Sequence, residues 1–213
     1  ASKGQYAPLM QLLNEKGAES SIEDRKWFAK EAFAVSSGYD TAIFNYFDNG
    51  EDSYFRCAEN DAKVLRYGEN PHQKGLFFGK FDEMFEQLHG KEISYNNLLD
   101  IDAAVSLIAE FDELTFAILK HNNACGLASR PVLVDAWKAA LAGDPVSAFG
   151  GVLITNGKID KATAEEMNNL FFEVVIAPGY DADALEILEQ KKNRIILVLK
   201  ENKTKSLQFR SLL

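Results

Sequence analysis

Four short apolar runs, separated by segments with helical spacing, constrain the fold of this chain more than any other feature. The runs are Leu114–Leu119, Gly151–Thr155, Phe172–Ala177 and Arg194–Leu199. Each has the length and composition of a buried strand. Between or before them, apolar residues recur about one helical turn apart in 99–111, 131–141, 160–170 and 182–191. This alternation predicts a layered α/β domain with a largely parallel or mixed sheet and helices on both faces.

The first 50 residues have a different pattern of apolar residues, which indicates helices without strands. Tyr6–Lys16 carries apolar residues at helical spacing, and Ser20-Ser21-Ile22-Glu23 resembles a capping box that opens a second helix. We expect Gly38 to interrupt that helix before a further helical stretch at 39–47, and Asn49-Gly50 to form a turn. Residues 51–65 have no clear period and predict an irregular connector.

Composition and charge narrow the possible partners. The 213 residues are 46% hydrophobic, which is enough to form a core and argues against disorder. A net charge of −9 argues against general affinity for nucleic acids or anionic membranes, although a local basic pocket for a phosphate remains possible. The two cysteines, Cys57 and Cys125, fit a reducing cytoplasm. With no apolar run of membrane-spanning length and no secretory signal, the sequence predicts a cytoplasmic protein.

Lys120 and His121 directly follow the first apolar run, so their side chains can emerge at an edge of the sheet. A histidine can move a proton near neutral pH, and a neighbouring lysine can stabilise developing negative charge. The same dipeptide also fits an ordinary charged strand end with a surface histidine. From spacing alone, both interpretations remain open.

Three other polar or glycine-rich clusters could contact a ligand. Arg66, in the loop Leu65–Gln73, has a guanidinium suited to an oxyanion, and Tyr67 beside it could stack or donate a hydrogen bond. Ser147–Gly151 offers small residues and one aromatic ring for contact with a flat base. Pro178-Gly179-Tyr180 follows another apolar run. Because ligands in α/β sheets bind at the carboxyl ends of strands, we expect the clusters at strand ends to mark the site, although each also fits a structural turn.

A zinc site is not indicated. Zinc deaminases pair a His or Cys with a Glu and follow it with two closely spaced cysteines. Here Asn122-Asn123 follows His121, and Cys125 stands alone. The sequence therefore predicts no metal requirement, and Cys125 is interpreted as a loop or core residue.

Five stretches, in the same order, resemble motifs of one enzyme family, the AICAR transformylase domain of the bifunctional transformylase/IMP cyclohydrolase. They are Leu65–Gln73 (LRYGENPHQ), Ile93–Asp100 (ISYNNLLD), Lys120–Gly126 (KHNNACG), Asp144–Gly151 (DPVSAFGG) and Phe172–Pro178 (FEVVIAP). Together they cover about residues 60–180. Five ordered motifs make the resemblance specific.

The resemblance implies a fold and a division of the chain. Residues 1–50 look like the helical junction that follows the cyclohydrolase domain, whose catalytic region is not in this sequence. Residues 51–213 look like the first of two transformylase subdomains, which are cytidine-deaminase-like but without zinc. The second subdomain is also not in this sequence.

The resemblance also implies a reaction in de novo purine biosynthesis. In it, the 5-amino group of AICAR takes the formyl group of 10-formyltetrahydrofolate, the co-substrate, and no metal takes part. Lys120 and His121 would carry the catalysis, and the substrate-binding positions would be Arg66, Tyr67, Asn97, Phe149, Gly150 and Glu173.

The family builds this site across a homodimer, with folate contacts from the second subdomain, so we expect this chain alone to be nearly inactive. Family sequences from bacteria often have proline where this chain has Ala124, and the alanine could loosen the loop after His121. A non-catalytic nucleotide-binding module with the same deaminase-like fold remains the alternative hypothesis.

Overall fold

The computed structural model describes residues 2–48 and 54–200. The chain divides into two compact units, residues 1–62 and 63–213. The predicted turn at Asn49-Gly50, and with it the predicted domain boundary after residue 50, lies outside the described residues. Among the residues that are described, no helix is long and apolar enough to cross a membrane.

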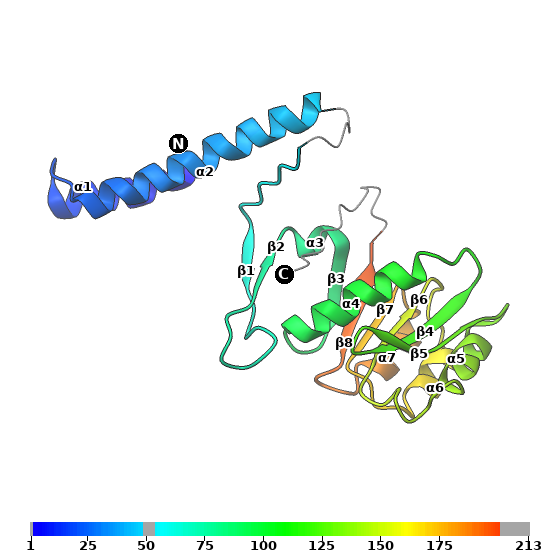
Figure 1. Ribbon diagram of the computed structural model, residues 1–213. Helices are drawn as coiled ribbons and strands as arrows, with labels where there is room; N and C mark the ends of the chain where they lie inside the picture. The colour runs from blue at the N-terminus through cyan, green and yellow to red at the C-terminus, as the bar shows by residue number, and fades with distance from the viewer. Residues whose placement is uncertain (1, 49–53, 201–213) are drawn as a thin grey trace. The chain divides into compact units, whose positions relative to one another are not determined.

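The N-terminal unit is helical, as predicted (Figure 1). A short 3₁₀ helix, η1 (Lys3–Gln5), leads into α1 (Tyr6–Lys16), and α2 spans Ile22–Phe47. The prediction that Gly38 interrupts the second helix is wrong, since α2 is continuous through it. One glycine within a helix costs only about 1 kcal/mol relative to alanine, which the other residues of a long helix can offset.

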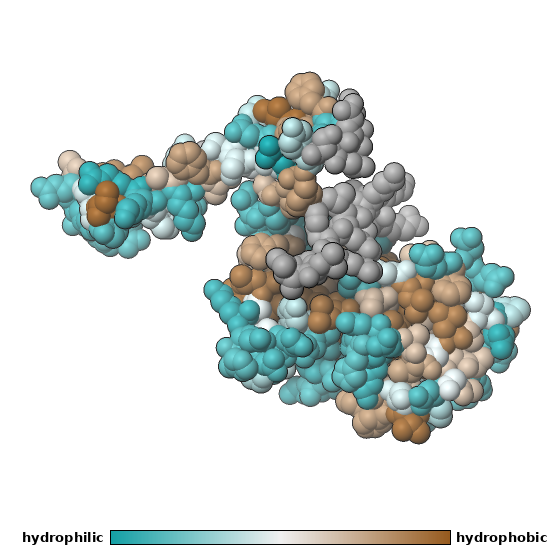
Figure 2. All heavy atoms as spheres, viewed as in Figure 1, coloured by the Kyte–Doolittle hydropathy of each residue, from teal (hydrophilic) through white to brown (hydrophobic). Residues whose placement is uncertain are grey.

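A capping box starts α2. The Ser21 hydroxyl accepts a hydrogen bond from the Asp24 amide at 3.1 Å, and the Asp24 carboxylate accepts one from the Ser21 amide at 2.8 Å. Lys16 Nζ donates to the same carboxylate at 2.7 Å. This bond and those from Ser21 lower the pKa of Asp24 to about 2. Neither α1 nor α2 has a buried residue, and both expose large apolar side chains. Such side chains show as brown spheres on this helical unit (Figure 2).

The second unit contains a six-stranded sheet (Figure 1). In spatial order the strands are β3 (Phe85–His89), β8 (Ile195–Leu199), β7 (Val174–Ala177), β6 (Val152–Thr155), β4 (Thr115–Lys120) and β5 (Asn123–Ser129). β6, β7 and β8 are mutually parallel, whereas the β3–β8, β4–β6 and β4–β5 pairs are antiparallel. The sheet is therefore mixed, which is one of the two predicted arrangements.

All four predicted strands are present, and they occupy the centre of the sheet. Every residue of β6 and β7 is buried, as are Thr115–Leu119 in β4. The outer strands β3 and β5 were not predicted. β5 has the sequence NACGLAS, whose small and polar residues give neither an apolar run nor an alternation. Edge strands need less apolar surface than central ones, so composition marks them weakly.

Helices cover both faces of the sheet, as predicted. α4 (Tyr95–Ile108) packs on one face, where Ile101, Ala104 and Ile108 meet Leu119 and Ile154. The other face is covered by α5 (Leu133–Leu141), α6 (Lys161–Met167) and α7 (Ala182–Leu188). The buried Trp137 of α5 packs edge-on against Phe116 of β4, with ring centroids 5.1 Å apart. The apolar strands thus lie in the middle layer of three.

A small hairpin and a short helix precede the large sheet in this unit. β1 (Ala62–Val64) pairs with β2 (Leu76–Phe78), and α3 (Phe81–Met84) leads into β3. The predicted connector 51–65 therefore ends in a strand. The hairpin presents the loop that contains Arg66.

Candidate functional site

Lys120 and His121 lie where β4 turns into β5. Lys120 pairs with Asn123, so His121 and Asn122 form a two-residue hairpin turn. Both turn residues have positive φ, 52° and 63°, as the turn types that match strand twist require. Asp100 of α4 holds the turn, because its Oδ1 accepts a hydrogen bond from the Asn122 amide at 2.7 Å. The exposed His121 side chain therefore projects from an anchored turn.

The antiparallel pairing of β4 with β6 brings the Phe149-Gly150 segment to Lys120. Leu119 of β4 pairs with Val152 of β6, so the end of β4 lies beside the start of β6. Lys120 Nζ donates to the Phe149 carbonyl at 2.8 Å. Gly150 has a φ of 76°, which favours glycine, and its amide donates to the Phe171 carbonyl at 2.8 Å.

Two exposed aromatic rings stand beside this segment. Phe149 is 58% exposed and Phe171 is 52% exposed, and their ring centroids are 5.1 Å apart. Exposed rings next to a lysine and a histidine form a surface on which a flat heterocycle can pack. The sequence indicated Phe149 but not Phe171.

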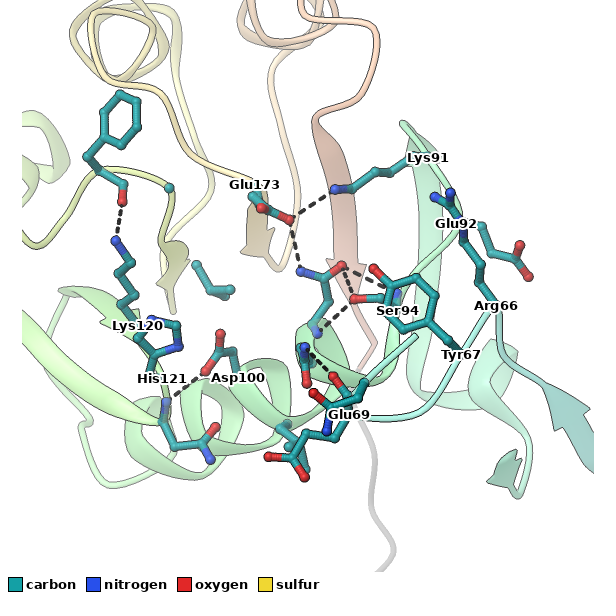
Figure 3. Close-up of a pocket in the computed structure, with 18 of the residues that line it drawn as sticks. Arg66, Tyr67, Glu69, Lys91, Glu92, Ser94, Asp100, Lys120, His121 and Glu173 are labelled. Carbon is teal, nitrogen blue, oxygen red and sulfur yellow. Dashed lines mark hydrogen bonds and ion pairs between the residues drawn. The ribbon is translucent and has the colours of Figure 1, made fainter. Parts of the chain in front are cut away.

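Glu173 lies between Lys120 and Lys91 in the view of the site (Figure 3), and Asn97 is hydrogen-bonded to it; we call this pair the floor of the site. Glu173 immediately precedes β7, and its Oε2 accepts hydrogen bonds from Asn97 Nδ2 at 3.2 Å and Lys91 Nζ at 3.0 Å. Asn97 is buried, and its Oδ1 also accepts from the amide and the hydroxyl of Ser94, the N-cap of α4. Asn97 thus caps a helix and orients a carboxylate at once.

Arg66 and Tyr67 come from the β1–β2 loop and lie across the site from Lys120 and His121 (Figure 3). The loop closes on itself through backbone hydrogen bonds from Leu65 to Gly75 and from Gly68 to Gln73. A Cβ on Gly75 would lie 2.5 Å from the Tyr67 carbonyl, so the loop needs glycine there. The guanidinium of Arg66 lies 5.7 Å from the Tyr67 ring centroid and is exposed. Its exposed position allows this guanidinium to reach an anion in the site.

These elements enclose a cleft of about 790 Å³. All eight residues predicted for the site line it: Arg66, Tyr67, Asn97, Lys120, His121, Phe149, Gly150 and Glu173. Lys91, Ser94, Asp100 and Phe171 also line it and were not predicted. Ser94 and Asp100 belong to the Ile93–Asp100 motif, which could have indicated them, whereas Lys91 and Phe171 carried no signal beyond their closeness to motifs.

The cleft agrees with the rule for parallel sheets at one strand only. It lies at the carboxyl end of β4 but at the amino ends of β6 and β7, because β4 runs antiparallel to them. Pro178-Gly179-Tyr180 follows the carboxyl end of β7 and does not line the cleft. The Tyr180 hydroxyl donates to backbone carbonyls of Val175 and Leu197, and burial raises its pKa well above 10.0. This third cluster is structural.

Among the described residues, no group of three or more His, Cys, Asp or Glu side chains is placed to hold a metal ion. Cys125 is half-buried and packs against the core, in agreement with its interpretation as a structural residue. Burial, followed by the charge of Asp144, raises the pKa of its thiol above 9.0. A raised pKa lowers the thiolate fraction and so disfavours a nucleophilic role.

Comparison with known families gives a match over the full chain. The model of the AICARFT/IMPCHase bienzyme family matches residues 1–213. The chain is 73% identical over its whole length to the bifunctional purine biosynthesis protein PurH of Bacteroides thetaiotaomicron, and the match covers 42% of that protein.

More distant relatives have the same name. The PurH protein of Caldicellulosiruptor saccharolyticus is 42% identical over 93% of this chain and 41% of its own length. That of Rhodospirillum rubrum is 45% identical over 91% of this chain and 38% of its own length. The chain thus spans about two fifths of the length of the curated relatives it matches.

Proposed function

Because this chain belongs to the AICARFT/IMPCHase bienzyme family, we propose that it supplies the nucleotide-binding part of a formyl-transfer site in purine biosynthesis. The substrates would be AICAR and 10-formyltetrahydrofolate. The observation that carries the proposal is the cleft itself: eight residues taken from five separate motifs line one cavity of about 790 Å³.

The proposed reaction moves a formyl group from one nitrogen to another. The 5-amino nitrogen of AICAR attacks the formyl carbon, and a carbon–nitrogen bond forms. The resulting tetrahedral intermediate carries its charge on the formyl oxygen. The bond between that carbon and N10 of the folate then breaks, N10 gains a proton, and the amino nitrogen loses one. The amine is a weak nucleophile because its lone pair is delocalised, so catalysis requires a base and stabilisation of the oxyanion.

His121 and Lys120 are suited to these two tasks. The exposed His121 side chain can accept the proton of the amino group, and the turn that carries it is anchored through Asp100. The Lys120 ammonium is held at the Phe149 carbonyl, 2.8 Å away, which orients a positive charge at the cleft wall. From there it can stabilise the oxyanion or donate a proton to the departing nitrogen.

The remaining residues are suited to hold the nucleotide. The exposed guanidinium of Arg66 would bind the phosphate through paired hydrogen bonds, with Tyr67 beside it. Phe149 and Gly150 would contact the flat imidazole ring and its carboxamide. Asn97 and Glu173, which are hydrogen-bonded to each other, would offer polar contacts on the floor of the cleft.

Several parts of the proposal concern the longer relatives. The folate contacts, a homodimer, the cyclohydrolase activity, a cytoplasmic location and a second zinc-free deaminase-like subdomain all remain predictions for a protein that contains this chain. The match to about 42% of a relative that is named as bifunctional supports looking for both activities in such a protein.

The test is a formyl-transfer assay on a full-length bifunctional protein that contains this chain. His121→Ala should lower kcat at least about 100-fold, the usual contribution of a general base, and leave the AICAR dissociation constant within about threefold. His89→Gln is the matched control. His89 lies in β3, outside the cleft lining, with its Nε2 3.3 Å from the Lys191 carbonyl. Its removal should leave kcat nearly unchanged.

Near-normal turnover of His121→Ala would reject the catalytic assignment of this residue. If the unaltered full-length protein binds AICAR but never forms formyl-AICAR, the alternative of a non-catalytic nucleotide-binding module replaces the proposal.

A further inference from the structure

The hairpin turn that carries His121 has a backbone conformation that residues with side chains rarely adopt. His121 and Asn122 both have positive φ, 52° and 63°. Two-residue hairpin turns with this geometry favour glycine at the second position, because a Cβ crowds the backbone there, and here both positions carry side chains. Residues in this region stay there only when their surroundings fix them. The position of His121 therefore depends on the contacts that hold the turn.

Helix α4 holds Asn122 through both of its amide groups. The backbone amide donates to Asp100 Oδ1 at 2.7 Å. The side-chain amide, oriented with its nitrogen toward the two acceptors, donates to the Leu99 carbonyl and to Asp100 Oδ1, both at 3.1 Å. A further contact lies inside the hairpin, where Asn123 Nδ2 donates to the His121 carbonyl at 2.7 Å. The contacts from outside the hairpin thus come from α4, and Asp100 is the charged acceptor among them.

Asp100 stands on a helix that is fixed in the core. The next residue, Ile101, is buried, and so is Ala104 one turn later. Both belong to the core cluster that contains Leu119, the residue before Lys120. The Asp100 side chain is itself half-buried. A rigid element therefore carries the carboxylate to the turn.

The face of α4 that includes Asp100 contacts three separate parts of the cleft. Asn96, Asn97 and Asp100 share this face, because residues three and four apart lie on the same side of a helix, and all three line the cleft. Asn96 Nδ2 donates to the Glu69 carbonyl of the β1–β2 loop at 3.3 Å, and Asn97 Nδ2 donates to Glu173 at 3.2 Å. Asp100 is the member of the set that contacts the catalytic turn.

We propose that Asp100 is a positioning residue for formyl transfer, which acts through His121 by holding the left-handed turn with its carboxylate (Figure 3). The inference rests on the proposed function, in which His121 takes a proton from the amino group. A base must lie within hydrogen-bond reach of that proton, and a displacement of about 1 Å can lower a rate about 100-fold. Asp100 therefore controls the rate of the reaction and contributes little to the affinity for AICAR.

The first experiment measures formyl transfer by the full-length protein. Asp100→Ala should lower kcat about 30-fold and leave the KM for AICAR within about twofold. Asp100→Asn keeps an oxygen that can accept from the Asn122 amide, so its kcat should recover to within about threefold of the unaltered protein. Asp102→Ala is the matched control and should leave kcat unchanged, because Asp102 is an exposed carboxylate of the same helix outside the cleft lining.

A double variant tests whether Asp100 acts through His121. If it does, Asp100→Ala/His121→Ala should have the same kcat as His121→Ala, within about twofold, because positioning has no effect once the base is absent. A further loss of about 30-fold in the double variant would show that Asp100 affects the rate independently of His121. That result would overturn the inference.

An experiment on the turn itself uses amide hydrogen exchange in the 213-residue chain, measured by NMR. In Asp100→Ala, the Asn122 amide should exchange about tenfold faster, because a charge-assisted hydrogen bond is lost. Asp102→Ala should match the unaltered chain. If Asp100→Ala also matched it, Asp100 would not hold the turn, and the inference would be wrong.

Three kinetic results would also overturn the inference. They are a kcat of Asp100→Ala within about twofold of the unaltered protein, a kcat of Asp100→Asn as low as that of Asp100→Ala, and a rise in KM for AICAR at constant kcat. In each case His121→Ala should still lower kcat, so the proposed function would stand. Conversely, a full-length protein without formyl transfer would reject the proposed function, while hydrogen exchange would still decide whether Asp100 holds the turn.

Discussion

The two walls of the main cleft are built in different ways. The sheet wall consists of residues at or near the ends of strands of the large sheet, namely Lys120, His121, Phe149, Gly150 and Glu173. The loop wall consists of Arg66 and Tyr67, on a hairpin loop that closes through its own backbone bonds. The adjoining strands β4, β6 and β7 are almost entirely buried, whereas Arg66 is exposed.

Because of this difference, changes on the sheet wall should mainly alter stability, and changes on the loop wall should mainly alter ligand binding. On the sheet wall, the backbone that carries the functional side chains is part of the core, so a change that moves the backbone also destabilises the fold. On the loop wall, a side chain can be removed with little effect on packing. Changes there should alter ligand affinity and leave the free energy of unfolding nearly constant.

The largest expected effect is on the backbone behind the sheet wall. Gly126 of β5 lies opposite Ile118 of β4, and a Cβ there would be 1.8 Å from the Ala140 carbonyl of α5. Because the clash is with backbone, Gly126→Ala should lower the free energy of unfolding by about 3 kcal/mol, measured by urea denaturation. Gly179→Ala is the control, since its nearest neighbour, Lys158 Cγ, lies at an ordinary 3.6 Å. Equal stability of the two variants would contradict the packing argument.

A smaller effect, of a different kind, is expected on the loop wall. Arg66→Ala should weaken AICAR binding about 30-fold, because a charge-assisted hydrogen-bond pair to the phosphate is lost. Its free energy of unfolding should stay within about 0.5 kcal/mol of the original. Calorimetric titration measures the affinity, and Lys74→Ala, an exposed cation of the same loop outside the cleft lining, serves as the control. If Arg66→Ala lowered the free energy of unfolding but kept its affinity for AICAR, the proposed difference between the two walls would be wrong.

A smaller effect is expected in the unaltered chain, as a difference between the alkylation rates of its two cysteines. Cys57 is exposed, whereas Cys125, next to the sheet wall, is half-buried and has a pKa raised by burial. Because alkylation requires the thiolate, iodoacetamide should label Cys57 several-fold faster at about pH 7.5. The rate at Cys125 should go on rising as the pH passes 9.0, the usual pKa of the group. Mass spectrometry of timed samples measures both rates, and equal rates would show that the sheet wall opens readily.

The smallest effect is expected for the ion pair on the cleft floor. Glu173→Gln removes the charge that pairs with Lys91, while an amide oxygen can still accept from Asn97. Both partners are partly exposed, 42% and 37%, so solvent screens the pair. The free energy of unfolding should fall by about 0.5 kcal/mol, as measured by urea denaturation. A loss above about 2 kcal/mol would mean that this ion pair, rather than the packing of the sheet, stabilises the floor of the cleft.

Local sequence predicted much of the fold, for reasons visible in particular segments. The central strands β4, β6, β7 and β8 have continuous apolar runs because both faces are covered, and α5 buries Leu133, Ala136, Trp137 and Ala140 at helical spacing. The edge strand β5 lacks such a run, and so escaped prediction. The eight site residues could be named because their motifs have a specific order, although no local rule predicted that they share one cleft.

The sequence by itself determined which segments are buried and which residue types stand at their ends, because burial requires apolar side chains at a fixed period. Tertiary structure alone decided the direction of each strand, since a buried strand has the same composition in parallel and antiparallel pairs. The antiparallel β4 set Lys120 beside the start of β6. The left-handed turn at His121, and the approach of Gly90 to Arg194, likewise depend on residues distant in the chain.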